Sequence, residues 1–373
     1  MRETLDEYRD REAAESRRDE RRELSERFQE APTNPLECAL ANIDTDVENW
    51  SSAAMARGLL RGYDSQWCES QRDMRLLSME QMLQASLVNL NTGAPSRTFR
   101  MAGKIDKLCE LSSRRKILVD HKTTSMEIEN PDSTYWSQLV IDSQPSHYEL
   151  LLHLNGIQID HVLWDVIRKP GIRPKKLSKA DATAVSSLHE YVGFRVSESG
   201  SRVSSDMREN AELYEHRVAR ESSDNPTKYF ARRNAKRTND ELAEYGVELW
   251  DVATEMREAR NHGRHYRNAG SCFNYGSPCR FLGVCSGHDT VDSDNWTRAE
   301  QVHNELDVDG DGKDLLTNSR LKCFQTCRRK HYYEYELGVR KVDEEEREAL
   351  YFGTMFHAAL DLYWERSTIG ATL

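Results

Sequence analysis

The spacing of apolar residues changes several times along the chain, and each change predicts an element of the fold. Between residues 38 and 63, apolar positions recur at roughly helical spacing, which predicts helical core. From Phe99 to Thr124 the period falls to two on both sides of the polar turn at 112–115, so we expect a β-hairpin. A helix from about Ser143 is followed by a buried strand that ends at Pro170. This succession predicts an α/β fold with a mixed sheet.

Polar and acidic stretches divide the chain into four predicted regions. Residues 1–35 carry opposite charges three and four positions apart and few apolar side chains, which predicts a charged helical extension. Residues 36–290 hold the patterned strands and helices and form the predicted core. Residues 291–314 are acidic and turn-rich and are expected to be a linker. Residues 315–373 return to strong helical patterning.

Composition excludes several classes of protein. The 373 residues, 38% hydrophobic and 31% charged, are typical of a globular chain with one large or two ordinary domains. No apolar run approaches the ~18 residues of a membrane span, and the first residues do not resemble a signal peptide, so we expect a cytoplasmic protein with no membrane contact. A phosphate-binding loop of the type G-x-x-x-x-G-K-[ST] is absent, which argues against a helicase motor within the chain.

Charge alone does not decide whether the chain binds nucleic acid. The net charge of −11 argues against a surface that is basic all over, but a local basic groove is compatible with it. Clumps of basic residues can contact phosphates or can simply form solvated faces; they comprise Arg168, Lys169, Lys175, Lys176, Arg232, Arg233, Lys236 and Arg237.

The predicted hairpin gathers charged side chains on one face. Because side chains alternate along a strand, Asp120 and Lys122 share a face of one strand, and Asp106 lies on the corresponding face of its partner. If the hairpin is symmetric about Ser113, Asp106 and Asp120 lie opposite each other, with Cβ atoms about 5 Å apart. Two such carboxylates suit Mg²⁺ or Mn²⁺, and the lysine can act on a metal-bound water. The alternative is an exposed hairpin whose Asp and Lys pair in solvent.

Three motifs place this hairpin in a wider context. They are G-K-I-D at 103–106, V-D-H-K-T-T at 119–124, and Gln144-x-x-x-Tyr148 on the next helix. Together they resemble the PD-(D/E)xK nuclease superfamily, in its RecB-like branch of exonucleases. The resemblance implies a restriction-endonuclease-like mixed sheet core flanked by helices, with helical additions and a cysteine-rich cluster loop.

The same resemblance implies a role for each matching residue. Asp106 and Asp120 would bind the metal, His121 would offer its backbone carbonyl to it, and Lys122 would assist the reaction. Gln144 and Tyr148 would stand beside the DNA. Without the hairpin, those last two residues would be an ordinary pair one turn apart on a helix surface.

Three of the eight cysteines fall close together in a loop-rich stretch: Cys272, Cys279 and Cys285. In an intracellular protein of this size we do not expect a disulfide framework. Zinc ribbons and zinc fingers do not use this spacing, whereas a four-thiolate site can hold an iron–sulfur cluster with one distant ligand. Zinc in place of iron, or three ordinary buried cysteines, are the alternatives.

The segment S-R-L-K-C-F-Q-T-C-R-R-K-H-Y-Y, followed by F-G-T-M-F-H, resembles the stretch that normally opens the RecB-like nuclease domain. The resemblance implies that Cys327 is the fourth cluster ligand, in a cluster with four irons, and that His357 joins the metal site. Cys323 matches no ligand position, and Arg328 replaces the usual proline. Since this segment follows the cluster loop instead of preceding the hairpin, we infer a circular permutation. A misassembled reading frame would give the same sequence.

These features predict a metal-dependent DNA nuclease, most simply an exonuclease, acting in DNA repair, recombination or phage DNA processing. Its expected cofactors are Mg²⁺ or Mn²⁺ and an iron–sulfur (4Fe–4S) cluster. DNA is the expected partner, together with a separate helicase or recombination protein. The alternative from a different class is a non-catalytic iron–sulfur module that binds DNA ends or serves as a scaffold, for which the carboxylates and the lysine would be unnecessary.

Overall fold

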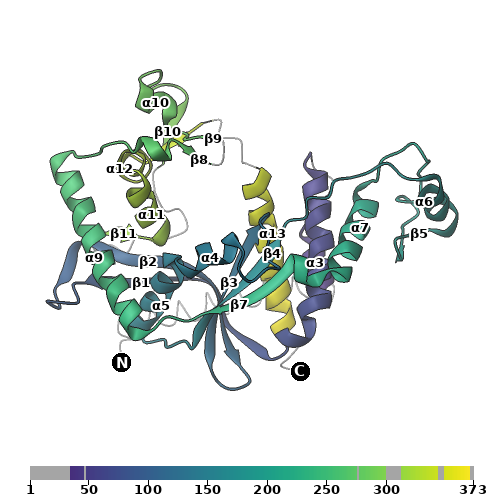
Figure 1. Cartoon of the computed structure of the whole chain (residues 1–373), viewed down its shortest axis with the longest axis horizontal. Helices are drawn as coiled ribbons and strands as arrows, with labels where there is room; N and C mark the ends of the chain where they lie inside the picture. Colours follow the sequence, from purple (N-terminus) through teal and green to yellow (C-terminus); the bar gives the residue numbers. More distant parts are fainter. Residues whose placement is uncertain (1–33, 46–47, 275–276, 300–311, 343–347, 370–373) are drawn as a thin grey trace, which may run out of the picture.

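The computed structural model describes residues 34–45, 48–274, 277–299, 312–342 and 348–369. Its centre is a six-stranded sheet in the order β1-β2-β3-β4-β7, with β11 paired to β2 (Figure 1). The β3–β4 and β11–β2 pairs are parallel and the others are antiparallel, so the sheet is mixed. The strands are β1 (Met74–Val88), β2 (Pro95–Leu111), β3 (Lys116–Thr124), β4 (His161–Arg168), β7 (Phe230–Ala235) and β11 (Asp314–Leu316).

Two separate apolar cores cover the two faces of this sheet. The first packs alternate residues of β3 and β4 against four helices: α2 (Pro35–Ala41), α3 (Trp50–Gln71), α7 (Ala211–Asp224) and α13 (Glu348–Ile369). The second packs the opposite face against three others: α5 (Ser143–Leu154), α9 (Asn239–His262) and α11 (Asn318–Thr326). The expectation of a mixed α/β core flanked by helices, of the restriction-endonuclease-like type, is therefore confirmed.

The β2–β3 hairpin has the register that its sequence predicts. Its ladder runs from Lys107 opposite Val119 to Glu110 opposite Lys116, so the turn is symmetric about residue 113. The polar turn closes with the Arg114 N–H donating to the Leu111 carbonyl. A single-residue slip of one strand would turn its charged candidates, Asp106 on β2 or Asp120 and Lys122 on β3, to the other face, and the buried apolar residues of both strands oppose such a slip.

Two smaller units extend from the sheet. One contains α6 (Lys179–Thr183), the π-helix η1 (Ala184–Leu188), β5 (Glu190–Tyr191) and β6 (Phe194–Arg195), whereas α4 (Thr134–Val140) and α8 (Pro226–Tyr229) pack on the sheet itself. The other, at the top of Figure 1, is the cysteine-rich unit, residues 264–299 and 327–342. Its elements are η2 (Ala269–Ser271), β8 (Phe273–Asn274), β9 (Ser277–Pro278), α10 (Leu282–Ser286), β10 (Trp296–Arg298), α12 (Arg328–His331), η3 (Tyr332–Glu336) and β12 (Val339–Lys341).

Several elements differ from the sequence expectation. No element was expected at β1, and β7 lies in a stretch whose basic clumps hide its strand pattern. Both ends of the predicted linker 291–314 enter strands, because β10 pairs with β12 and β11 begins at Asp314. The predicted extension at 1–35 and residues 300–311 fall outside the described residues, except that α2 begins at Pro35.

None of the described helices is long and apolar enough to cross a membrane.

Candidate active site

The hairpin brings the two predicted carboxylates together at the end of its ladder. Lys107 and Val119 form the last pair, and Asp106 and Asp120 are the next positions in the same register. Asp106 Oδ2 accepts a hydrogen bond of 2.9 Å from the backbone N–H of His121, which holds its carboxylate against β3. Asp120 is buried, and within the described residues its Oδ1 has no hydrogen-bond partner. One buried carboxylate oxygen is therefore left without a donor beside a second carboxylate.

Electrostatics make this pair unusual. The pKa of Asp120 is raised to about 7, chiefly because burial disfavours the charged form; the nearby Asp106 acts in the same direction and Lys122 opposes both. The Lys122 Nζ lies 2.7 Å from Asp120 Oδ2. Burial alone would lower the pKa of Lys122, but the attraction of Asp120 outweighs it and the net shift is upward. Lys122 thus remains charged, and it only partly compensates the cost of burying Asp120.

Lys122 is also connected to the two predicted DNA-side residues. Its Nζ donates to Gln144 Oε1 at 2.7 Å, and Gln144 Nε2 donates to the Tyr148 hydroxyl at 3.1 Å. Asp142 caps α5 by accepting the Gln144 N–H, so Pro145 lies in the first turn, where a missing N–H costs nothing. A Cβ at Gly103 would come within 3.0 Å of the Tyr148 ring, which explains the glycine before Lys104 and Asp106.

His121 and His357 lie on the side of the sheet covered by α13. The two imidazole rings are 6.1 Å apart and meet edge to face. Burial lowers the pKa of His357, while the Asp106 carboxylate acts in the opposite direction, so His357 lies within the field of that carboxylate. The C-terminal helix therefore returns to the hairpin although more than two hundred residues separate them.

The four predicted cluster cysteines fall in one neighbourhood. The Cys279 N–H donates to the Cys272 carbonyl at 2.7 Å, and Cys279 and Cys285 pack on the small core formed by Phe281, Tyr333 and Val339. Burial raises the pKa of the Cys285 thiol, and the thiols of Cys279, Cys327 and Cys272 raise it further. The late segment and the cysteine loop are therefore parts of one unit.

Cys327 and Cys323 differ in their surroundings. Cys327 ends α11 and its sulfur accepts the N–H of Asn268 at 3.4 Å, on the cysteine loop. Cys323 lies within α11, where burial raises the pKa of its thiol to about 12. The thiols of Cys327, four residues later, and of Cys279, on the cysteine loop, act in the same direction, and the effect of Cys279 was not expected from the sequence.

No three His, Cys, Asp or Glu side chains in the described part of the chain converge as a metal site. At the hairpin, Lys122 takes one oxygen of Asp120 and the His121 N–H takes one of Asp106. Liganding by His357, and by the four thiols together, therefore remains a prediction.

Sequence reasoning missed a set of buried polar residues behind β3, and two of the basic residues have internal partners that the sequence did not indicate. Arg232, expected as a phosphate contact or a solvated residue, is buried and bonds to Asp165 at 3.0 Å. Arg237 donates to Ser146 and to the backbone carbonyls of Val140 and Asp142, and so braces the start of α5. The sequence did contain one indication of this buried set: Asp165 lies in the middle of the apolar strand L-W-D-V-I, where a charged side chain needs a buried partner.

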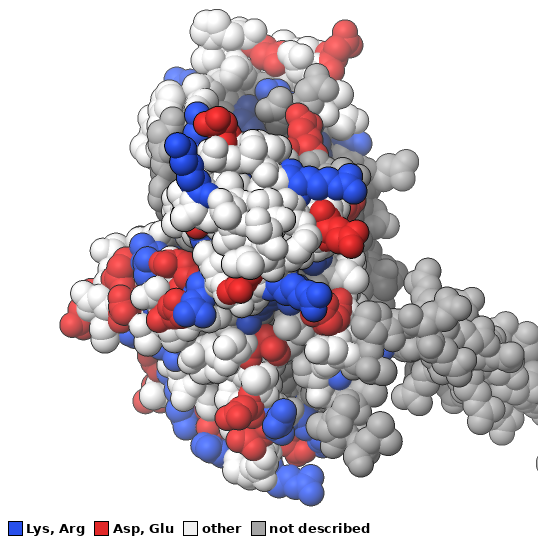
Figure 2. Space-filling view, turned by 90° about the vertical axis from the view of Figure 1, so that its right-hand side faces the viewer, with Lys and Arg blue, Asp and Glu red and all other residues white. Residues whose placement is uncertain are grey.

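The face of the molecule shown in Figure 2 has no large patch of a single charge sign among its described residues. On that side, where α6 and α7 lie, basic and acidic side chains are interspersed. This agrees with the net charge of −11, and a basic groove for nucleic acid is not found on this face.

Comparison with known families agrees with the site. The family model described as the PD-(D/E)XK nuclease superfamily matches residues 3–286 and 316–372. This chain therefore belongs to the PD-(D/E)XK nuclease superfamily. No curated protein and no solved structure shows a significant match to the chain. A metal-dependent nuclease activity is what membership of this superfamily suggests.

Proposed function

We propose that this protein is a Mg²⁺- or Mn²⁺-dependent deoxyribonuclease of the RecB-like type, acting as an exonuclease. The observation that carries the proposal is the pairing of Asp106 and Asp120 in the hairpin register with Lys122 2.7 Å from Asp120. A scaffold protein would gain nothing from burying a carboxylate whose oxygen lacks a donor, because such burial is destabilising. A cation offsets that cost.

The residues at the hairpin fit a hard divalent cation. Asp120 Oδ1 is buried and free of donors among the described residues, and Asp106 lies in the adjoining position of the register. In our proposal Asp106, Asp120, the His121 carbonyl and His357 would hold Mg²⁺ or Mn²⁺. When bound, the metal would polarise the phosphodiester and lower the pKa of a coordinated water.

The protein side chains supply the rest of the chemistry. Lys122 keeps its proton and lies at the carboxylates, so in the proposed reaction it orients the attacking water and stabilises the negative charge that develops on the phosphate. Gln144 fixes the Lys122 ammonium through a 2.7 Å hydrogen bond. Tyr148 fixes Gln144 in turn, and both stand on the side from which DNA would approach.

We propose further that Cys272, Cys279, Cys285 and Cys327 bind one 4Fe–4S cluster that stabilises the cysteine-rich unit and takes no part in hydrolysis. Soft thiolates suit iron–sulfur clusters, and the effect of the other three thiols on the pKa of Cys285 supports their grouping. Zinc is the competing metal. Anaerobic purification followed by iron and zinc analysis distinguishes the two, because a colourless protein with stoichiometric zinc would replace iron in this account.

We also infer that the segment order is a circular permutation. The family model matches in two parts, 3–286 and 316–372, and the second part carries Cys327 and His357. Their placement beside the cysteine loop and the hairpin supports one nuclease domain assembled from both segments. A role in DNA repair, recombination or phage DNA processing in the cytoplasm, with a separate helicase or recombination protein, completes the proposal.

The test is cleavage of end-labelled linear and covalently closed circular DNA, single- and double-stranded, with Mg²⁺, with Mn²⁺ and with a chelator. We expect cleavage of linear DNA only when metal is present, with circles resistant if the enzyme needs an end. Binding that weakens with salt, with no cleavage under any condition, would instead favour the non-catalytic DNA-end-binding module.

A further inference from the structure

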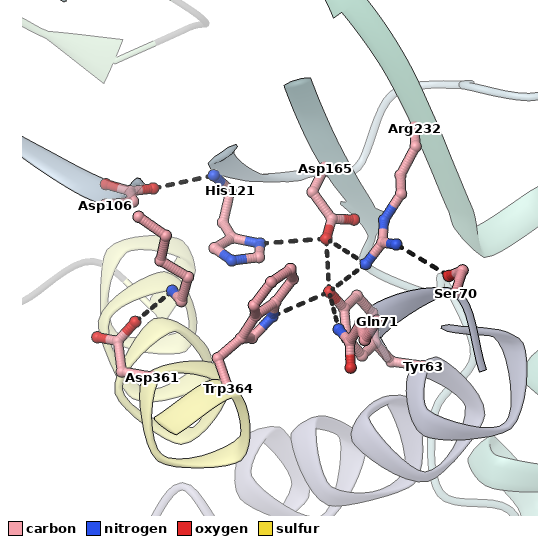
Figure 3. Close-up of polar contacts among 10 residues, drawn as sticks. Tyr63, Ser70, Gln71, Asp106, His121, Asp165, Arg232, Asp361 and Trp364 are labelled. Atoms are coloured by element: carbon pink, nitrogen blue, oxygen red, sulfur yellow. Dashed lines mark hydrogen bonds and ion pairs between the residues drawn. The ribbon is translucent and has the colours of Figure 1, made fainter. Parts of the chain in front are cut away.

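A row of buried polar side chains crosses the sheet directly behind the candidate active site. His121 on β3 is opposite Asp165 on β4, and Asp165 is opposite Arg232 on β7. The side chains of His121 and Asp165 are fully buried, and that of Arg232 is 8% exposed. The His121 Nδ1 lies 3.5 Å from Asp165 Oδ2, and Arg232 donates to the same oxygen at 3.0 Å (Figure 3). The middle residue of the D-H-K motif therefore begins this row.

The hydroxyl of Tyr63, from α3, is the centre of the row. It donates to Asp165 Oδ2 at 2.5 Å and accepts from Arg232 at 3.0 Å and from Gln71 Nε2 at 3.2 Å. It also receives the indole N–H of Trp364 at 3.3 Å. Removing this one oxygen atom would therefore break contacts to two strands and two helices at once.

Helix α13 docks on this row with the same face that carries the predicted metal ligand. His357, Asp361 and Trp364 are spaced four and three residues apart, so they share one side of the helix. The Trp364 ring contacts the His121 ring at 5.7 Å, and Asp361 Oδ1 pairs with the buried Lys107 at 2.6 Å (Figure 3). The His357 ring lies 6.1 Å from the His121 ring, and the negative charge of Asp106 raises the pKa of His357 against the larger lowering effect of burial.

Packing alone would not require these charges. The surrounding core is apolar, and ion pairs inside it are costly unless every partner is in place. If α13 slid by one turn, Lys107 would lose Asp361 and Tyr63 would lose Trp364, and each would leave a buried polar group without its partner. An apolar interface of the same size would tolerate such a shift far better. The row therefore selects one register of α13 against the sheet.

We propose that Tyr63, Asp165 and Arg232 are positioning residues, which pack behind the side chain of His121 and hold α13 in the register that places His357 against His121. They touch neither DNA nor metal. They act on the backbone of β3 between Asp120 and Lys122 and on the helix that brings the last predicted ligand. This inference rests on the proposed nuclease function, since it concerns the geometry of that site.

The variant Tyr63→Phe tests the proposal with the smallest change of volume. We expect its dissociation constant for Mn²⁺, measured by calorimetry on the protein without DNA, to rise about tenfold, as is typical when groups that orient metal ligands are removed. The control is Tyr214→Phe, since Tyr214 is equally buried beside α3 but donates to the Ile172 carbonyl, away from the row. We expect the control to bind Mn²⁺ as the wild type does.

A second variant guards against loss of folding. Trp364→Phe keeps an aromatic ring against His121 but removes the N–H that reaches Tyr63, and we expect a smaller loss of Mn²⁺ affinity in the same direction. Both variants are measured well below their melting temperatures. A purely structural role would lower Tm and leave the Mn²⁺ dissociation constant unchanged, and that result would overturn the proposal.

A double-mutant cycle with His357→Ala tests the route of the effect. If the row acts through α13, Tyr63→Phe should weaken Mn²⁺ binding much less in the His357→Ala background than in the wild type. Fully additive losses would refute action through His357.

Wild-type protein that cuts DNA and binds Mn²⁺, with Tyr63→Phe indistinguishable from it, would refute the positioning role alone. Wild-type protein that does neither would refute the proposed function, and the positioning role with it.

Discussion

The hairpin site and the cysteine-rich unit belong to one chain but are held together in different ways. Around the hairpin, strand register and two helix-covered cores fix the side chains, and Asp120, Lys122, Gln144 and Tyr148 form a continuous set of contacts. In the cysteine-rich unit the buried apolar residues are few, namely Phe281, Tyr333 and Val339 with their neighbours, and four half-buried thiols lie among short elements.

The difference indicates what each region requires from a metal. A large core is stable without a ligand and can tolerate a destabilising buried carboxylate for the sake of chemistry. A unit with a small core generally needs a disulfide or metal for stability. We therefore expect removal of metal from the hairpin to abolish activity while leaving the fold, and removal of the cluster to unfold the cysteine-rich unit.

Lys122→Ala should have a large effect on DNA cleavage. Loss of the ammonium at the carboxylates is expected to slow DNA cleavage by about 10²–10⁴-fold, measured under single-turnover conditions. Lys116→Ala, at the start of the same strand and away from the carboxylates, is the matched control and should retain full activity. Equal loss in the two variants would mean that the effect comes from the strand and not from the site.

Cys327→Ser and Cys323→Ser compare a predicted ligand with a neighbour four residues away on the same segment. Cys327→Ser should lose iron and increase proteolysis within residues 264–299, because one thiolate of the cluster is missing. Cys323→Ser should keep its iron and be mildly destabilised, measured by iron content and limited proteolysis. The reverse pattern would show that the segment is misaligned with the family.

Asp120→Asn should have the smallest effect on stability, and the sign is opposite to that of most core mutations. Because burial raises the pKa of Asp120 in the folded state to about 7, the unfolded chain ionises more easily and stability falls as pH rises from about 4 to 7. In metal-free protein at pH 8, Asp120→Asn is therefore expected to raise Tm by about 2–5 °C. Below pH 4 the two proteins should melt together. A lower Tm for Asp120→Asn at pH 8 would contradict the inference that the buried, charged Asp120 carboxylate destabilises the metal-free protein.

The parts of the fold that sequence predicted are those with local periodicity. The alternation of apolar and polar residues across 99–124 predicted the hairpin. Its symmetry about residue 113 predicted that Asp106 and Asp120 lie opposite each other. The row behind β3 could not be predicted, because Tyr63, Asp165, Arg232 and Trp364 come from four elements that meet only in the folded sheet. Strand β7 was missed since its arginines suggested a solvated stretch, whereas Arg232 is buried by its pairing with Asp165.

The assignment of the active site to the β2–β3 hairpin is tested by cleavage of one end-labelled DNA by wild type and Asp120→Asn, with DNA binding measured alongside. We expect that wild type cuts the DNA with Mg²⁺ or Mn²⁺ and that Asp120→Asn binds the same DNA with similar affinity, remains folded and does not cut it. Cleavage by Asp120→Asn at the wild-type rate would contradict the assignment of the active site to the β2–β3 hairpin.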